Sequence, residues 1–148
     1  MTAVVHGPGE GEQLQVGPNL LVIKATSEMT GGGFFLSETT LGPGVSGPPA
    51  HTHETLTDMF YVLEGALVLR VGDDEVPAPA GTFACAPPGT VHTFRNASDE
   101  EPARFLNFNV PGGFEQYMRE LAAASADGTP ATPQEIGAIA SRYDIQIA

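Results

Sequence analysis

Three of the four histidines lie in two short segments that are bounded by glycine and proline. His51 and His53 belong to residues 48–65, and His92 belongs to residues 81–96. Side chains two positions apart on a β-strand point to the same face, so His51 and His53 would project together. A sheet that folds back can bring His92 to them. Imidazoles that converge in this way are ligands for a divalent transition metal, so the sequence predicts a metal site.

The spacing of these residues resembles the two sequence motifs of the cupin family. In the first motif, four residues separate His53 from Asp58 and six separate Asp58 from Gly65. The leading glycine of this motif is offset, and Asp58 stands where the family usually has glutamate. The second motif is matched at each of its positions, by Gly81, Pro87, Gly89, His92 and Asn96. The resemblance covers roughly residues 41–110.

The resemblance implies one divalent transition metal (Fe, Ni, Mn, Co, Cu or Zn) held by His51, His53, Asp58 and His92. Nitrogen and carboxylate donors suit all of these ions, so the ligand set does not select one. Because aspartate is one methylene shorter than glutamate, Asp58 either ligates the metal, acts through a water, or serves as a base beside a three-histidine metal. Glu54 is a poor substitute because strand alternation points it away from the face of His53. The alternative is a cupin that keeps its histidines as cavity lining without a metal.

The same resemblance assigns catalysis to Asp58 and His92. Phe60 shares strand parity with Asp58, and Phe94 shares it with His92, so we expect both rings to line an apolar substrate pocket. Core packing is the alternative for these rings. Cys85 lies beside alanines in an expected strand, so we expect a buried and unreactive thiol.

Similarity to the quercetin dioxygenase-like group of small cupins favours a metal-dependent dioxygenase or related oxidoreductase. It implies a small enol-containing or aromatic substrate inside the barrel, with its enolate on the metal. The second hypothesis is a non-redox cyclase, isomerase or lyase on a polyketide-like or sugar-like substrate, with Asp58 moving a proton. The third is a cupin that binds a small molecule without turnover, because a fold alone does not fix a function.

Composition restricts the partners of the chain. Its 148 residues fit one domain, and its formal net charge is −12. Such an acidic chain lacks the basic surface that nucleic acids need, and anionic membranes repel it. There is no apolar run near transmembrane length and no signal-peptide pattern, and the single cysteine cannot form an internal disulfide. We therefore expect a cytoplasmic protein with a small-molecule substrate and no nucleic-acid or membrane partner.

Short β segments between glycine and proline turns must position these residues, so the chain is predicted to be mainly β. We expect strands at residues 20–25, 34–40, 59–63, 66–71, 75–79, 82–86, 91–96 and 103–110. The prolines of residues 75–79 favour an edge strand. With the two motifs, these strands imply a cupin-type antiparallel β-barrel, that is, a double-stranded β-helix or jelly roll. Residues 1–12 are expected to be a flexible lead-in.

Residues 114–144 change character and predict two short helices that pack on the barrel. The first has an apolar stripe at helical spacing, formed by Phe114, Tyr117, Met118 and Leu121. The second begins with the capping pattern Thr132, Pro133 and Glu135. Residues 1–148 would therefore be a single cupin domain.

One strand also presents apolar side chains to the other face. Met59, Tyr61 and Leu63 alternate along the strand with Asp58, Phe60 and Val62, which point inward. The three outward side chains must therefore be covered by another element or subunit. This pattern and the family resemblance favour a homodimer.

Overall fold

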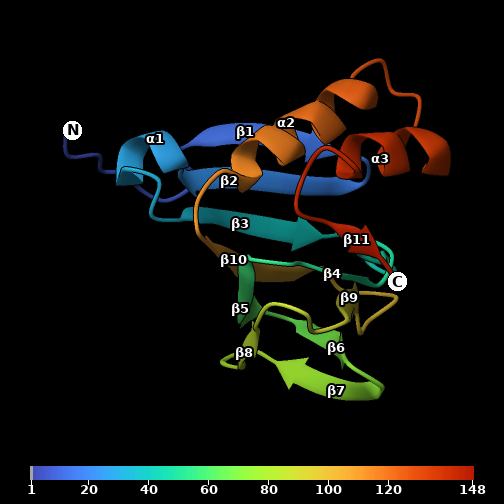
Figure 1. Cartoon of the computed structure of the whole chain (residues 1–148). Helices are drawn as coiled ribbons and strands as arrows, with labels where there is room; N and C mark the ends of the chain where they lie inside the picture. Colours follow the sequence, from blue (N-terminus) through green and yellow to red (C-terminus); the bar gives the residue numbers. More distant parts are fainter. Residues whose placement is uncertain (1) are drawn as a thin grey trace.

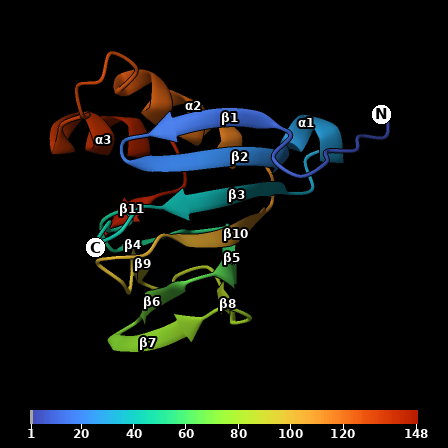
Figure 2. The same ribbon diagram turned by 180° about the vertical axis from the view of Figure 1, so that it is seen from behind.

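The computed structural model describes residues 2–148 and is mainly β, with two antiparallel sheets and helices beside them (Figure 1, Figure 2). The strands are β1 (Glu12–Val16), β2 (Asn19–Ala25), β3 (Phe35–Leu41), β4 (His51–Thr52), β5 (Thr57–Glu64), β6 (Ala66–Val71), β7 (Asp74–Pro79), β8 (Phe83–Ala86), β9 (His92–Asn96), β10 (Ala103–Val110) and β11 (Gln146–Ile147). The helices are α1 (Ser27–Thr30), α2 (Phe114–Ala124) and α3 (Pro133–Ala140). The predicted mainly β chain with two short C-terminal helices is confirmed.

The strands of the described residues form two sheets. One has the order β1-β2-β3-β10-β5-β8, and the other has the order β11-β4-β9-β6-β7. The β5–β6 connection turns at Gly65 from the first sheet to the second, and the φ of 68° at this position favours glycine. A Cβ at Gly65 would also lie 2.5 Å from the carbonyl oxygen of Pro102, so a larger residue cannot fit. Strand β7 lies at a sheet edge, as its prolines predict.

The main core lies between the two sheets, where alternate residues of each strand point inward. Strand β3 alternates strictly between buried and half-buried residues, as expected for a strand with one face in the core. The apolar core cluster contains Leu41, Phe60, Val62, Leu67, Leu69, Ala78, Ala103 and Phe105. This cluster fills the interior beside the histidines, because Phe60 and Val62 follow Asp58 on the same face of β5.

A second apolar cluster joins the two C-terminal helices. Its buried members are Tyr117, Ile139, Ala140 and Ile145, with the rest of the α2 stripe packed against them. Helix α2 lies along β1, and α3 lies beside α2 (Figure 1). The predicted start of α3 is confirmed: the Thr132 side chain accepts from the backbone N–H of Glu135, and the Glu135 carboxylate accepts from the N–H of Thr132. Among residues 2–148, no helix is long and apolar enough to cross a membrane.

The structure contains two strands and one short helix, α1, that the sequence analysis did not predict, and it corrects the prediction for one cysteine. β1 pairs with β2, and β11 pairs with β4; β1 has only two alternating apolar residues, Leu14 and Val16, and β11 is only two residues long. Cys85 is exposed, so the prediction of a buried thiol is wrong. The reason is register: Ala86 faces inward opposite Asp58, and strand alternation then points Cys85 outward.

Candidate metal centre

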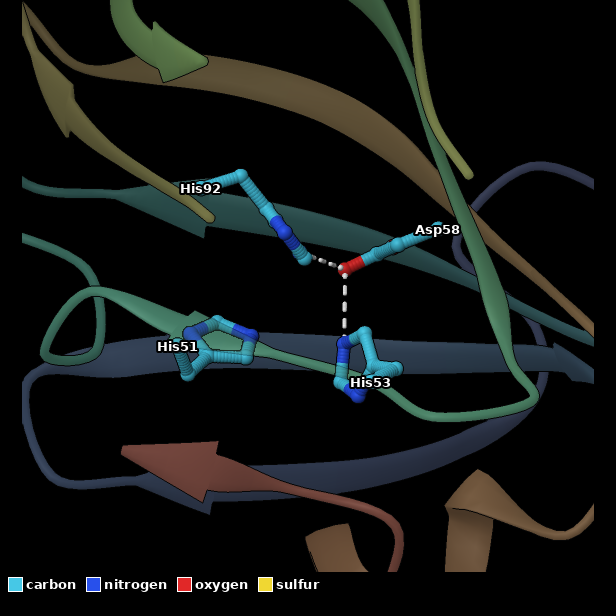
Figure 3. A group of neighbouring side chains, drawn as sticks. All are labelled: His51, His53, Asp58 and His92. Atoms are coloured by element: carbon cyan, nitrogen blue, oxygen red, sulfur yellow. Dashed lines mark hydrogen bonds and ion pairs between the residues drawn. The ribbon is translucent and has the colours of Figure 1, made fainter. Parts of the chain in front are cut away.

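Four side chains from the two motifs converge between the sheets. His51 and His92 face each other as a cross-strand pair of β4 and β9, His53 follows β4, and Asp58 is the second residue of β5. One ligand atom from each residue can be chosen so that all four lie within 4.8 Å of one another. All four side chains are buried, and Figure 3 shows them pointing toward a common centre. The structure thus brings together the four residues that the motifs single out.

The two motifs also contact each other through the backbone. The N–H of Gly89 donates to the carbonyl of His53 at 2.8 Å. Gly89 adopts a φ of 83°, which lies in the left-handed region that favours glycine. This turn therefore links the second motif to the first ligand segment.

Each histidine ring is held by a backbone carbonyl at Nδ1. His51 Nδ1 donates to Pro49 at 2.9 Å and His92 Nδ1 donates to Thr90 at 2.9 Å. His53 Nδ1 donates to Asp144 at 2.6 Å. A carbonyl can only accept, so the proton of each neutral ring is on Nδ1 and the Nε2 lone pair is free.

The Nε2 atoms accordingly face the centre of the cluster. His53 Nε2 is buried and has no hydrogen-bond partner among residues 2–148. The nearest Asp58 oxygen lies 3.6 Å away, which is too long for a hydrogen bond. A buried nitrogen without a partner is costly, and a metal ion satisfies it.

Asp58 reaches the cluster despite its short side chain. Its Oδ2 lies 3.0 Å from His92 Nε2, on the side that faces the histidines. Its Oδ1 accepts from the side-chain amides of Asn107 at 2.6 Å and Asn109 at 2.7 Å. One oxygen is therefore held by β10, and the other is directed toward the site.

Sequence reasoning missed these two asparagines. Asn107 and Asn109 lie two positions apart in the second half of β10, among apolar residues, and β10 pairs with β5 so that Asn109 is directly opposite Asp58. Two amides on the inward face of a strand were the available signal, because inward polar groups need a partner. Only the strand order shows that the partner is Asp58.

The charges of the metal-free cluster follow from burial and from the carboxylate. Burial lowers the pKa of His51 to about 4, which keeps that ring neutral at pH 7. Burial alone would lower the pKa of His53, but the adjacent Asp58 carboxylate and the hydrogen bond to the Asp144 carbonyl outweigh burial and raise the pKa. Burial would raise the pKa of Asp58, but the neighbouring His53 and His92 rings and the Asn107 amide lower it, so the carboxylate is ionised.

The donor set fits a divalent transition metal. Three imidazole nitrogens and one ionised carboxylate are available in a buried site, and each of them has a second partner that fixes its orientation. Such outer hydrogen bonds are typical of protein metal sites. His51, His53, Asp58 and His92 could therefore bind one metal ion, and the donor types do not select which.

The expected pocket residues Phe60 and Phe94 lie beside the cluster. The Phe60 ring centroid is 6.3 Å from that of His92 and 5.5 Å from that of Phe94. Phe60 and His92 line a cavity of about 10 Å³, which is about the size of one water. A larger cavity of about 210 Å³ is lined by residues of the loop after His53 and of the C-terminal segment, among them Thr55, Phe114 and Asp144.

Comparisons with known proteins agree with this geometry. The family model described as Cupin domain matches residues 37–109. Quercetin 2,3-dioxygenase from Bacillus subtilis is 34% identical over 113 residues, which cover 76% of this chain and 33% of that protein. The chain therefore spans about a third of the length of this curated relative.

Two solved structures illustrate the shared fold. KdgF from Halomonas sp. has a TM-score of 0.66 at 18% identity, covering 78% of this chain and 99% of that one. A sugar phosphate isomerase of the cupin superfamily from Silicibacter pomeroyi has a TM-score of 0.56 at 28% identity, covering 64% of this chain and 60% of that one. These matches and the two facing sheets confirm the predicted jelly-roll architecture.

Proposed function

Because this chain belongs to the cupin family, we propose that it is a metal-dependent enzyme, a dioxygenase or related oxidoreductase that acts on a small enol-containing or aromatic substrate. The observation that supports this most strongly is the buried convergence of three Nε2 atoms and the Asp58 carboxylate. The Nδ1 atom of each of the three histidines donates to a backbone carbonyl, so the free Nε2 lone pairs point inward. The dioxygenase class is supported by the Bacillus relative, which is named quercetin 2,3-dioxygenase.

His51, His53, Asp58 and His92 would hold the metal in this proposal. When bound, a redox-active metal supplies activation of dioxygen and of the substrate enolate, whereas zinc supplies Lewis-acid chemistry alone. Asp58 keeps an ionised Oδ2 at the centre because the amides of Asn107 and Asn109 hold Oδ1. Beside a metal held by the three histidines alone, this oxygen would instead accept the proton of an enol, and His92, 3.0 Å from it, would be the second catalytic residue because it holds the metal next to that oxygen.

The substrate would bind next to Phe60, with Phe94 behind it as the apolar wall. The cavity of about 10 Å³ at Phe60 and His92 is too small for an aromatic ring, so binding requires these side chains to move apart. This requirement is a further part of the proposal. Phe94→Ala removes the ring that packs on Phe60 and leaves Phe60 room to move, so it should lower KM for a bulky substrate more than for a small one.

A non-redox reaction is the second candidate. It is favoured by the ionised Oδ2 of Asp58, which faces the site and could take a proton from a bound substrate and return it in a reaction that needs no dioxygen. The sugar phosphate isomerase from Silicibacter pomeroyi, at 28% identity, belongs to the same superfamily. An isomerase or lyase would use the same ligands, with the metal polarising a carbonyl.

Metal analysis followed by assays with and without oxygen separates these candidates. The protein is purified without a histidine tag, its metal is measured, and a panel of flavonols, other enols and sugar derivatives is tested. Oxygen consumption coupled to substrate loss supports the dioxygenase. Turnover in anaerobic buffer supports the non-redox enzyme, and binding without turnover would contradict both.

The outer face of β5 and β8 is proposed as a homodimer contact. Tyr61 is 44% exposed and Phe83 is 60% exposed, and the two are cross-strand neighbours at the edge of the six-stranded sheet. An open edge strand with large apolar groups favours pairing with a second copy. Phe83→Glu should lower the mass measured by light scattering from that of two chains to that of one. A cytoplasmic location also stays a prediction.

A further inference from the structure

Residues 143–148 contact the metal-binding segment in three ways: through strand pairing, through the Asp144 carboxylate and through the Asp144 backbone carbonyl. Strand β11 pairs with β4, so that Ile147 is opposite His51, and the N–H of Ala148 donates to the carbonyl of Ala50 at 2.8 Å. Figure 3 shows β11 running beneath His51 and His53. Strand β4 has only two residues, and its pairing with β9 is limited to His51 and His92. The C-terminal strand therefore supplies the second partner of a very short ligand strand.

The Asp144 carboxylate organises the loop that joins His53 to Asp58. Its Oδ1 accepts from the N–H of Glu54 at 2.6 Å, and its Oδ2 accepts from the N–H groups of Thr55 at 2.8 Å and Leu56 at 2.9 Å. The Thr55 hydroxyl also donates to Oδ2, at 2.9 Å. One carboxylate thus fixes three consecutive backbone amides, which limits the paths that this loop can take.

The backbone carbonyl of the same residue holds His53. It accepts the Nδ1 proton at 2.6 Å, and this selects the tautomer whose Nε2 faces the cluster. His51 and His92 depend instead on carbonyls two residues before them in their own segments. His53 is therefore the one ligand ring whose orientation is set by a distant part of the chain.

Residue 144 is itself held by the helices. Ile145 is buried in the apolar cluster of α2 and α3, and the Tyr143 ring packs on Tyr117 with centroids 5.5 Å apart. The Tyr143 hydroxyl donates to the Glu120 carboxylate of α2. The two sequence neighbours of Asp144 thus fix its position relative to the helical cluster.

We propose that residues 143–148 form a C-terminal clamp in which Asp144 is a positioning residue for the metal centre, acting through His53 and the loop of residues 54–56. This inference rests on the proposed metal-binding function and deepens it. The helices would then be part of the site, because they fix the residue that orients a ligand. Changes to partners of this kind typically weaken metal binding by roughly 10–100-fold.

The test compares Co²⁺ binding in full-length variants freed of metal. Asp144→Ala removes the carboxylate but keeps the backbone carbonyl, and it should weaken Co²⁺ binding by roughly 10–100-fold. The visible absorption bands of bound Co²⁺ should shift, because the His53 ring and the loop relax. Asp144→Asn, which keeps one acceptor oxygen, should restore part of the affinity. The matched control is Asp127→Ala, which removes a carboxylate that, among residues 2–148, accepts only from the exposed Thr129 N–H.

The outcomes separate the clamp from the metal site. If wild type binds one Co²⁺ and His92→Ala does not, the metal site stands. Unchanged affinity and spectrum in Asp144→Ala would then overturn the clamp alone. A wild type that binds no Co²⁺ would overturn the site and the clamp together. If circular dichroism shows that Asp144→Ala is unfolded, Asp144→Asn decides, because wild-type affinity and spectrum in that folded variant contradict the proposal.

Discussion

The three histidine ligands are held in two different ways. His51 and His92 each donate Nδ1 to a carbonyl two residues earlier, Pro49 or Thr90, so their own segments orient them. His53 donates to Asp144, which is 91 positions away. A locally held ligand keeps its orientation whenever its segment folds. A remotely held ligand also requires the helices and the C-terminal strand to be in place.

The largest effect should come from removing a locally held ligand. His92→Ala deletes one Nε2 from the cluster, and we expect metal affinity to fall by more than about 100-fold, beyond the roughly 10–100-fold cost of an outer-partner change. Isothermal titration of the metal-free protein measures this. His6→Ala is the control because the fourth histidine is outside the cluster. Equal losses in both variants would contradict the site.

Asp58 tests whether the carboxylate belongs to the ligand set. Because Oδ2 faces the histidines, we expect Asp58→Ala to weaken metal binding nearly as much as His92→Ala does. Asp58→Glu restores the residue usual in the family and should keep the metal. If Asp58→Ala retains the metal but loses turnover, Asp58 is a base and not a ligand. Full metal content with full activity in Asp58→Ala would show that Asp58 is neither a ligand nor a base.

The helices that hold Asp144 in place can be weakened by a substitution in their apolar cluster. Ile139 is 9% exposed in the α2–α3 cluster, and Ile139→Ala should lower the free energy of unfolding by about 2–5 kcal/mol because it leaves a cavity. Urea denaturation measures this. Val76→Ala on the edge strand β7, where Val76 is 43% exposed, should change it by less than about 0.5 kcal/mol. Similar changes in the two variants would show that the cluster adds little.

The smallest effect is expected at a second contact between distant residues, Glu115 and Ser27. Its contribution to stability depends on pH. The Glu115 carboxylate is buried, and it accepts from the N–H of Ser27 at 2.9 Å, from the Ser27 hydroxyl, and from the N–H of Gly113 at 3.1 Å. Burial would raise its pKa, but these hydrogen bonds outweigh burial and lower it below its ordinary value of 4.5. The carboxylate is therefore more stabilised when folded than when unfolded.

For a group whose pKa is lowered by folding, the added stability is present above the unfolded pKa and is lost as the pH falls below it. The difference in unfolding free energy between wild type and Glu115→Gln should thus be full at pH 7 and shrink as the pH falls below about 4.5, the ordinary value. Urea titrations at a series of pH values measure it. A difference that stays constant down to pH 3 would show that the charge of Glu115 is not involved.

Features that depend on local patterns can be read from the sequence. Glycine and proline turns mark the strands, and the spacing of the two motifs identifies His51, His53, Asp58 and His92. The capping pattern at Thr132 marks the start of α3. These features are set within a few residues, by backbone geometry and strand parity, so they can be recognised without knowing the fold.

The residues that surround the ligands are set by tertiary contacts between distant parts of the chain. Asn109 holds Asp58 because β10 lies next to β5, and Asp144 holds His53 because α2 and α3 carry the chain end back to β4. Cys85 faces outward because of the register of β8 against β5. Each of these contacts joins residues far apart in sequence, and strand order, register and helix packing cannot be derived from local spacing.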